Sequence, residues 1–211
     1  AKKVFQQALD IDKKELVNSQ HVIEDYDSLG NVFEKLGLLR EAADAYNSSA
    51  DLSGTVDSAK TVKRSESLQN SGRILVQLNQ YWESSRKFLE ASEILQKSQL
   101  TKGAALPILF SYGLARICFE IDGDKNVDSL QKLVNEPPIG TPSFRVLNEF
   151  EVLNTAIATM KDKSQLNEFK EALGLYLHNV NTQTNEQNSM LLKIRKFLER
   201  KDVSNADDGT L

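Results

Sequence analysis

The stretch YDSLGNVFEKLGLLREAADAYNSSADLSG, residues 26–54, decides the fold class. It has the spacing of a tetratricopeptide repeat (TPR): a large residue, then Leu-Gly, an aromatic residue, and a small–aromatic–small set on a second helix. Gly30 and Ala42 let two antiparallel helices approach closely, while Phe33 and Tyr46 fill the space between neighbouring pairs. The stretch therefore predicts a helical hairpin. The pattern is carried by Tyr26, Leu29, Gly30, Phe33, Ala42, Tyr46 and Ser49.

The pattern returns 42 residues later, which indicates a repeat architecture. The ordinary TPR period is ~34 residues, so we expect longer helices or loops here. A third and weaker copy, LFSYGLARICFEIDGDKNVDSLQKLVNE at 109–136, keeps Gly113 and has a turn at Gly123–Asp124. The equivalent pairs of the first two copies are Gly30 and Gly72, Ala42 and Ser84, Tyr46 and Phe88, and Ser49 and Ala91.

A proline-rich segment, NEPPIGTPSF at 135–144, marks the strongest boundary, because proline removes a backbone donor and stops a helix. Apolar residues recur at helical spacing on both sides, and almost nothing alternates as in a strand. We expect helices at about 143–160, 163–179 and 186–201. The predicted fold is all-α: a TPR-like solenoid of antiparallel helical hairpins at 1–136, a turn at 137–142, a C-terminal helical bundle at 143–201 and a flexible acidic tail at 202–211.

Charge and cysteine content restrict the class of function. The chain has 30 acidic and 26 basic residues and a net charge of -4, which argues against a dedicated nucleic-acid binder. The single cysteine, Cys118, fits a reducing compartment. No apolar run approaches the ~18 residues of a membrane span. We therefore expect a cytoplasmic protein, a monomer when free, with no more than peripheral attachment to membranes.

Residues that carry catalytic or metal chemistry are sparse. The two histidines, His21 and His178, lie far apart and lack a ligand partner at useful spacing. The acidic residues of EIDGDKNVD, at 120–128, do not have the spacing of a calcium-binding EF-hand loop. No glycine-rich phosphate loop is present. We predict a non-enzyme that holds no cofactor and no metal.

Two charged regions are candidate partner sites. Around the second repeat, positive charge could align on one face of the hairpins and attract an acidic coiled coil, although a charged solvent surface gives the same pattern. In the last helix, Met190, Ile194 and Leu198 belong to a core stripe, and cations occupy much of the remaining surface. The candidate basic residues are Lys63, Arg64, Arg73, Arg86 and Lys87.

In its order of segments, the chain resembles the later part of the soluble NSF attachment proteins, the SNAP family. The similar pieces are GRILVQLNQYWESSRKFLEASEILQKSQL at 72–100, LFSYGLARICFEIDGD at 109–124, and MLLKIRKFLERK at 190–201 with its acidic, Leu-ended tail. The resemblance implies an adaptor that joins SNARE coiled coils to the NSF disassembly ATPase. A basic face would contact the coiled coil, and Asp207, Asp208 and Leu211 would contact the ATPase.

The chain departs from the family in several places: the family's N-terminal hairpin and membrane-touching loop are not recognisable, and two further departures lie nearer the C-terminal end. The acidic cluster near the end of the helix before the last is replaced by IATMKDK at 157–163, where Asp162 is the only acid. The Leu-Asp-x-Trp start of the final helix is replaced by TQTNEQNSM at 182–190. Two other functions stay open: a general TPR module that binds a peptide in its concave groove, and a scaffold subunit of a larger complex. A disordered tail is the alternative to an ATPase contact.

Overall fold

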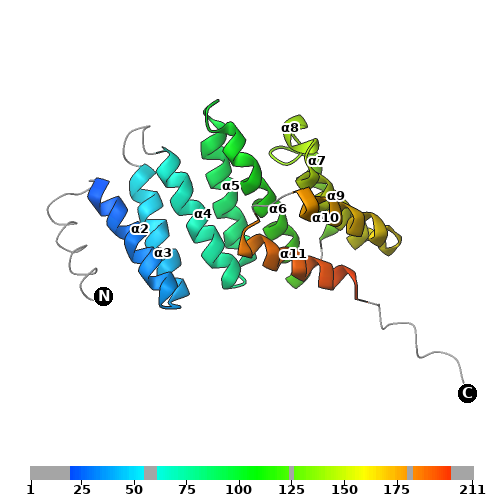
Figure 1. Ribbon diagram of the computed structural model, residues 1–211, viewed down its shortest axis with the longest axis horizontal. Coiled ribbons are helices and arrows are strands. Elements are labelled where there is room, and N and C mark those ends of the chain that lie inside the picture. The colour runs from blue at the N-terminus through cyan, green and yellow to red at the C-terminus, as the bar shows by residue number, and fades with distance from the viewer. Residues whose placement is uncertain (1–19, 55–60, 124–125, 180–182, 201–211) are drawn as a thin grey trace, which may run out of the picture.

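The computed structural model of the chain describes residues 20–54, 61–123, 126–179 and 183–200, and every regular element in these ranges is helical. In Figure 1 the helices stand side by side in a row from α2 to α6, and α11 runs across that row. The helices are α2 Gln20–Lys35, α3 Leu39–Gly54, α4 Thr61–Gln77, α5 Tyr81–Gln96, α6 Ala105–Asp122, α7 Val127–Asn135, α8 Pro142–Arg145, α9 Asn148–Lys161, α10 Leu166–Asn179 and α11 Asn185–Leu198; the 3-10 turns η2 Lys102–Ala104 and η3 Lys163–Gln165 precede α6 and α10.

The first two hairpins repeat one another along their whole length. Both helices of the second hairpin, α4 and α5, end 42 residues after their counterparts α2 and α3. The turns repeat as well: Leu38 N–H donates to Phe33 O at 2.9 Å, and Gln80 N–H donates to Leu75 O at 2.9 Å. The 42-residue offset expected from the sequence is therefore present in the structure of these two hairpins.

The two turns depend on a left-handed residue at the same place. Gly37 has φ 72°, and Asn79, 42 positions later, has φ 58°. Glycine adopts this conformation without strain, and asparagine is one of the few other residues that tolerate it. Each of these residues ends its helix, so that the next helix runs back antiparallel to it.

Replacing Gly37 with alanine is expected to lower the free energy of unfolding by about 1 kcal/mol, because the alanine Cβ is strained at positive φ. A Cβ at this position would meet nothing within 4 Å, so the cost is conformational and not steric. Urea unfolding followed by circular dichroism measures it. Gly103→Ala is the matched control, because its Cβ is also free of contacts and its φ is not positive. Equal stability of the two variants would refute the turn argument.

Close helix approach inside each hairpin also recurs. A Cβ on Gly30 would lie 2.6 Å from the Tyr46 ring, and a Cβ on Gly72 would lie 2.9 Å from the Phe88 ring. Glycine is therefore needed where the aromatic ring of the second helix lies on the first, as the sequence predicts for Gly30. In the third copy the equivalent Gly113 faces Leu153 of α9, so a helix from beyond the proline-rich turn takes this place.

The segment after the proline-rich turn differs in detail from expectation. The helix expected at 143–160 is divided into α8 and α9, because Leu147 has an extended backbone with φ -96° and ψ 151°. The helix expected at 163–179 starts with the turn η3 and becomes α-helical only at Leu166. The last helix, expected at 186–201, spans Asn185–Leu198.

The hydrophobic core has two parts. One lies within the first hairpin, around Tyr26, Phe33 and Tyr46, and extends to Ile74 and Leu75 of α4. The other is continuous from α4 and α5 through α6 to α9, α10 and α11. The proline-rich turn at 137–142 thus changes the direction of the chain, while a single core continues on both sides of it.

Helix α6 is the most apolar element. Together with η2, the segment Lys102–Asp122 is long and apolar enough to cross a membrane by length and composition, which the sequence reading did not anticipate. However, 67% of its most apolar window is buried within the protein. Helix α6 packs against α5, α9 and α11, and this central position explains why α6 is so rich in apolar residues.

Candidate functional site

The five basic residues singled out in the sequence lie on α4 and α5, and the structure pairs three of them with carboxylates. Lys63, Arg64 and Arg73 are all partly buried on α4 and form ion pairs. Arg86 and Lys87 lie on α5. The pairs point in different directions: Lys63 and Arg73 reach back to α2, whereas Arg64 reaches forward to α5.

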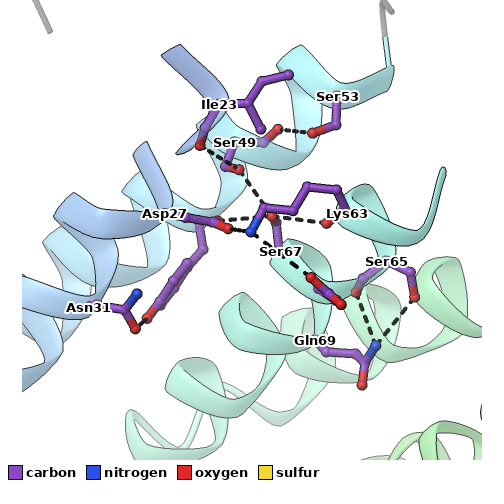
Figure 2. A network of polar contacts seen from close by, with 11 residues as sticks. Ile23, Asp27, Asn31, Ser49, Ser53, Lys63, Ser65, Ser67 and Gln69 are labelled. Atoms are coloured by element: carbon purple, nitrogen blue, oxygen red, sulfur yellow. Dashed lines mark hydrogen bonds and ion pairs between the residues drawn. The ribbon is translucent and has the colours of Figure 1, made fainter. Parts of the chain in front are cut away.

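Lys63 belongs to a buried polar network between the first and second hairpins, shown in Figure 2. Its ammonium group forms an ion pair with Asp27 of α2, whose side chain is only 10% exposed. Ser67 Oγ donates to Asp27 Oδ1 at 2.9 Å and lies 3.0 Å from Ser49 Oγ. Ser49 Oγ in turn donates to Ile23 O at 3.2 Å. Lys63 therefore has a structural role in joining α2, α3 and α4.

Replacing Asp27 with alanine is expected to lower the free energy of unfolding by about 2 kcal/mol. The Lys63 ammonium would lose its close, buried carboxylate and keep only the more distant Glu66, and the buried Ser67 hydroxyl would keep only Lys63 O as a backbone acceptor. Lys87→Ala on α5 is the control, and a surface change of this kind is expected to stay within about 0.5 kcal/mol. Chemical unfolding of both variants tests the prediction. If the Asp27→Ala variant is as stable as the parent protein, the network contributes nothing to the free energy of unfolding.

Arg64 and Arg73 make the other pairs. Arg64 NH2 lies 2.6 Å from Glu90 Oε1 of α5. Arg73 lies between two carboxylates, 3.4 Å from Glu34 of α2 and 3.5 Å from Glu186 of α11. Arg73 thus connects the first hairpin with the C-terminal helix, a contact that the sequence pattern could not indicate because its residues are up to 152 positions apart (186 − 34).

Arg86 and Lys87 are on the outer side of α5. They line a cavity of about 310 Å³ together with the carboxylates of Glu83, Glu90 and Glu93. The charge around the second repeat is therefore mixed, and cations alternate with carboxylates. Whether this surface holds a partner remains a prediction, and the predicted ATPase contacts Asp207, Asp208 and Leu211 lie outside the described residues.

A second candidate surface lies where α11 crosses the turn between α4 and α5 and the end of α6. Two cavities, of about 550 and 520 Å³, share Asn79, Tyr81 and Asp122 and so form one continuous depression. We call it the α11 groove. Its exposed lining includes two aromatic residues, two carboxylates, and three residues spaced four apart on α11 and just beyond its end: Trp82, Phe119, Glu83, Asp122, Leu192, Lys196 and Arg200.

Lys193 fixes α11 at the floor of this groove. Its Nζ atom lies 2.7 Å from the Asp122 carboxylate and 4.5 Å from the centre of the Tyr81 ring. Burial alone would lower the pKa of Lys193, but the hydrogen bond to Asp122 and the charge interaction with Tyr81 raise it above its usual value. Lys193 therefore stays charged and is neutralised by Asp122.

The start of α11 is held by a capping box that the sequence reading missed. Thr184 Oγ1 accepts from Gln187 N–H at 3.2 Å, and Gln187 Oε1 accepts from Thr184 N–H at 3.2 Å. The buried Gln187 amide also donates to Ser111 Oγ at 2.9 Å and to Pro107 O at 3.3 Å on α6. The signal was available in the sequence, because Thr-x-x-Gln before an apolar stripe is typical of a helix start.

Among the described residues, no group of three or more His, Cys, Asp and Glu side chains could hold a metal ion. Cys118 is fully buried on α6, with its thiol 3.8 Å from Met190 O of α11. Burial raises the pKa of the Cys118 thiol well above its usual value, which keeps it protonated and unreactive. Cys118 is therefore a core residue at the contact between α6 and α11.

Comparison with known proteins adds no identification. No protein-family model matches the chain, and no curated protein matches it with significant similarity. The function must therefore be inferred from the architecture and the surfaces described above.

Proposed function

We propose that the protein is a non-catalytic adaptor built as a TPR-like solenoid of antiparallel helical hairpins. In its specific form the proposal is a SNAP-type adaptor that links SNARE coiled coils to the NSF disassembly ATPase in vesicle transport. The observation that carries it is the recurrence of the first hairpin in the second, with the same turn, the same glycine–aromatic contact and the same 42-residue offset.

This recurrence supports an adaptor because stacked hairpins make an extended surface instead of a single enclosed pocket. The row from α2 to α6 in Figure 1 is long enough for an elongated partner to lie along it. Helices α9, α10 and α11 continue the core at the far end of the row. The SNAP resemblance implies this combination of hairpins and C-terminal helices, and it also supplies the proposed partners.

The first test of the SNAP-type function is the ATPase rate of NSF with the protein immobilised beside an assembled SNARE complex. We expect stimulation by the intact chain and its loss when Leu211 is removed, since the resemblance places the ATPase contact in the tail. If stimulation persists after this truncation, the ATPase contact lies in another part of the protein. If neither chain stimulates the ATPase while both are folded, the SNAP-type function is wrong.

The second test concerns the coiled-coil surface. Arg86→Glu/Lys87→Glu reverses two charges on the outer side of α5 without touching the core. Lys102→Glu/Lys132→Glu makes the same charge change at exposed positions on η2 and α7 and serves as the control. We expect only the first variant to weaken binding to an assembled SNARE coiled coil, and the parent's binding to weaken with added salt. Equal effects of the two variants would exclude this face.

A further inference from the structure

We propose that the α11 groove binds an acidic segment of a partner protein, with one apolar side chain anchored on Trp82 and Phe119 and carboxylates on Lys196 and Arg200. This surface adjoins the outer side of α5, because Glu83 lines both, but Arg86 and Lys87 are not among its lining residues. The proposal does not depend on SNARE or NSF as partners, because it uses only the residues that line the groove.

The apolar half of the groove is an exposed and ordered aromatic pair. The rings of Trp82 and Phe119 lie 5.2 Å apart, and their residues are 40% and 37% exposed. The Arg116 guanidinium lies 4.9 Å from the Trp82 ring centre and is itself held by Glu120 and Ser129. Trp82 is therefore fixed before any ligand arrives, which reduces the entropy lost on binding. A rigid, exposed tryptophan is a typical anchor point in protein interfaces.

The basic half of the groove lies at the C-terminal end of α11. Leu192 and Lys196 are four residues apart on the exposed side of the helix, and Arg200, two residues beyond its end, lines the same cavity. Lys193 is neutralised by Asp122, whereas no carboxylate partner is present for Lys196 or Arg200 within the described ranges. Cations near a helix C-terminus also stabilise the helix. Helix stabilisation alone would not explain why Lys196 and Arg200 line a cavity beside two exposed aromatic rings.

Together the two halves define the chemistry of the ligand. Among the described residues, the larger cavity is lined by the cations Lys193, Lys196 and Arg200 and by the carboxylate of Asp122, and the adjoining cavity adds Glu83. The α11 side of the groove therefore favours a negative ligand. The adjoining aromatic surface requires an apolar group as well. Single-stranded nucleic acid also combines these features, but it needs a basic track along its backbone. The chain carries a net charge of -4, and only two of the cations that line this groove have no carboxylate partner among the described residues. An acidic peptide segment with one apolar anchor fits better.

The experiment is fluorescence anisotropy with the full chain and a labelled decapeptide that has four glutamates on each side of a central leucine–phenylalanine pair. We expect saturable binding that weakens about tenfold in Lys196→Glu/Arg200→Glu and about tenfold in Trp82→Ala. Lys102→Glu/Lys132→Glu is the matched charge control and is expected to bind like the parent. A peptide with lysine in place of glutamate, and one with alanine in place of the apolar pair, should bind at least tenfold more weakly.

Several results would overturn the proposal. They are no saturable binding by the intact chain, equal binding by all three variants, and tighter binding of oligothymidine with the same variant sensitivity. Peptide binding seen only after removal of residues 201–211 would assign the groove to the chain's own tail. Concentration-dependent dimerisation that Trp82→Ala abolishes would assign it to a second copy. Circular dichroism of each variant verifies its fold, and none of these readouts involves a coiled coil or ATPase activity.

Discussion

Replacing Tyr46 with alanine is expected to lower the free energy of unfolding by about 4 kcal/mol. The ring is fully buried and fills the space beside Gly30 between α2 and α3. Its hydroxyl lies 3.0 Å from Asn31 Oδ1 and 3.2 Å from Glu34 Oε2. Burial, and then the charge of Glu34, raise the pKa of Tyr46 well above its usual value, so the hydroxyl keeps its proton as a donor. Urea unfolding measures the loss.

Two further variants separate the contributions to this effect. Tyr46→Phe keeps the ring and removes only the hydroxyl, for an expected cost of about 1 kcal/mol. Phe88→Ala removes the equivalent ring of the second hairpin, which lies on Gly72, and is expected to cost about as much as Tyr46→Ala. A cost of less than about 2 kcal/mol for Tyr46→Ala would show that the α2–α3 contact does not depend on this ring.

Replacing Ile194 with aspartate is expected to detach α11 from the stack and to destabilise the protein by about 4 kcal/mol. Ile194 is 1% exposed, so the new carboxylate would be buried without a partner. Cys118 lies directly beneath α11, with its thiol 3.8 Å from Met190 O. Detachment would therefore expose Cys118. The measurement is the rate at which N-ethylmaleimide modifies Cys118 in native buffer, followed by mass spectrometry.

The matched control is Leu192→Asp, which adds the same charge to α11 at a position that is 51% exposed. We expect this variant and the parent to keep Cys118 unmodified until the protein is unfolded by denaturant. A protected thiol in folded Ile194→Asp would mean that α11 stays docked, or that α6 is covered by other contacts. Rapid modification in the parent would contradict the buried position of Cys118.

The first two hairpins were predictable because their pattern is local. Gly30, Phe33 and Tyr46 stand at spacings typical of a helical hairpin, and Gly72 and Phe88 repeat two of them. The core stripe of the last helix was also largely predictable: Met190, Leu191, Ile194 and Leu198 are buried, and Phe197 is partly buried against the same core. In each case the information lies within one helix or one hairpin, where sequence spacing maps directly onto geometry.

The candidate sites were less predictable because charge pairing is not local. Lys63, Arg64 and Arg73 read as a basic cluster in the sequence, yet their carboxylate partners come from α2, α5 and α11. The sequence singled out the cations of the last helix, but it could not show the α11 groove that Lys196 and Arg200 line, for the same reason. Trp82 and Leu192 meet around one depression only because the last helix turns back across the stack. A solvated charge and a paired charge look alike until the tertiary contacts are known.

The crossing of α11 has a consequence for the order of folding. The hairpins α2–α3 and α4–α5 are stabilised by contacts between near neighbours in the chain, and such elements form early. Gln187, however, bonds to Ser111 and Pro107, 76 and 80 positions earlier. During synthesis the side of α6 that includes Cys118 must therefore wait, uncovered, until the ribosome has released the last helix. That interval is when the nascent chain is most exposed to aggregation, and when a chaperone would have a surface to bind.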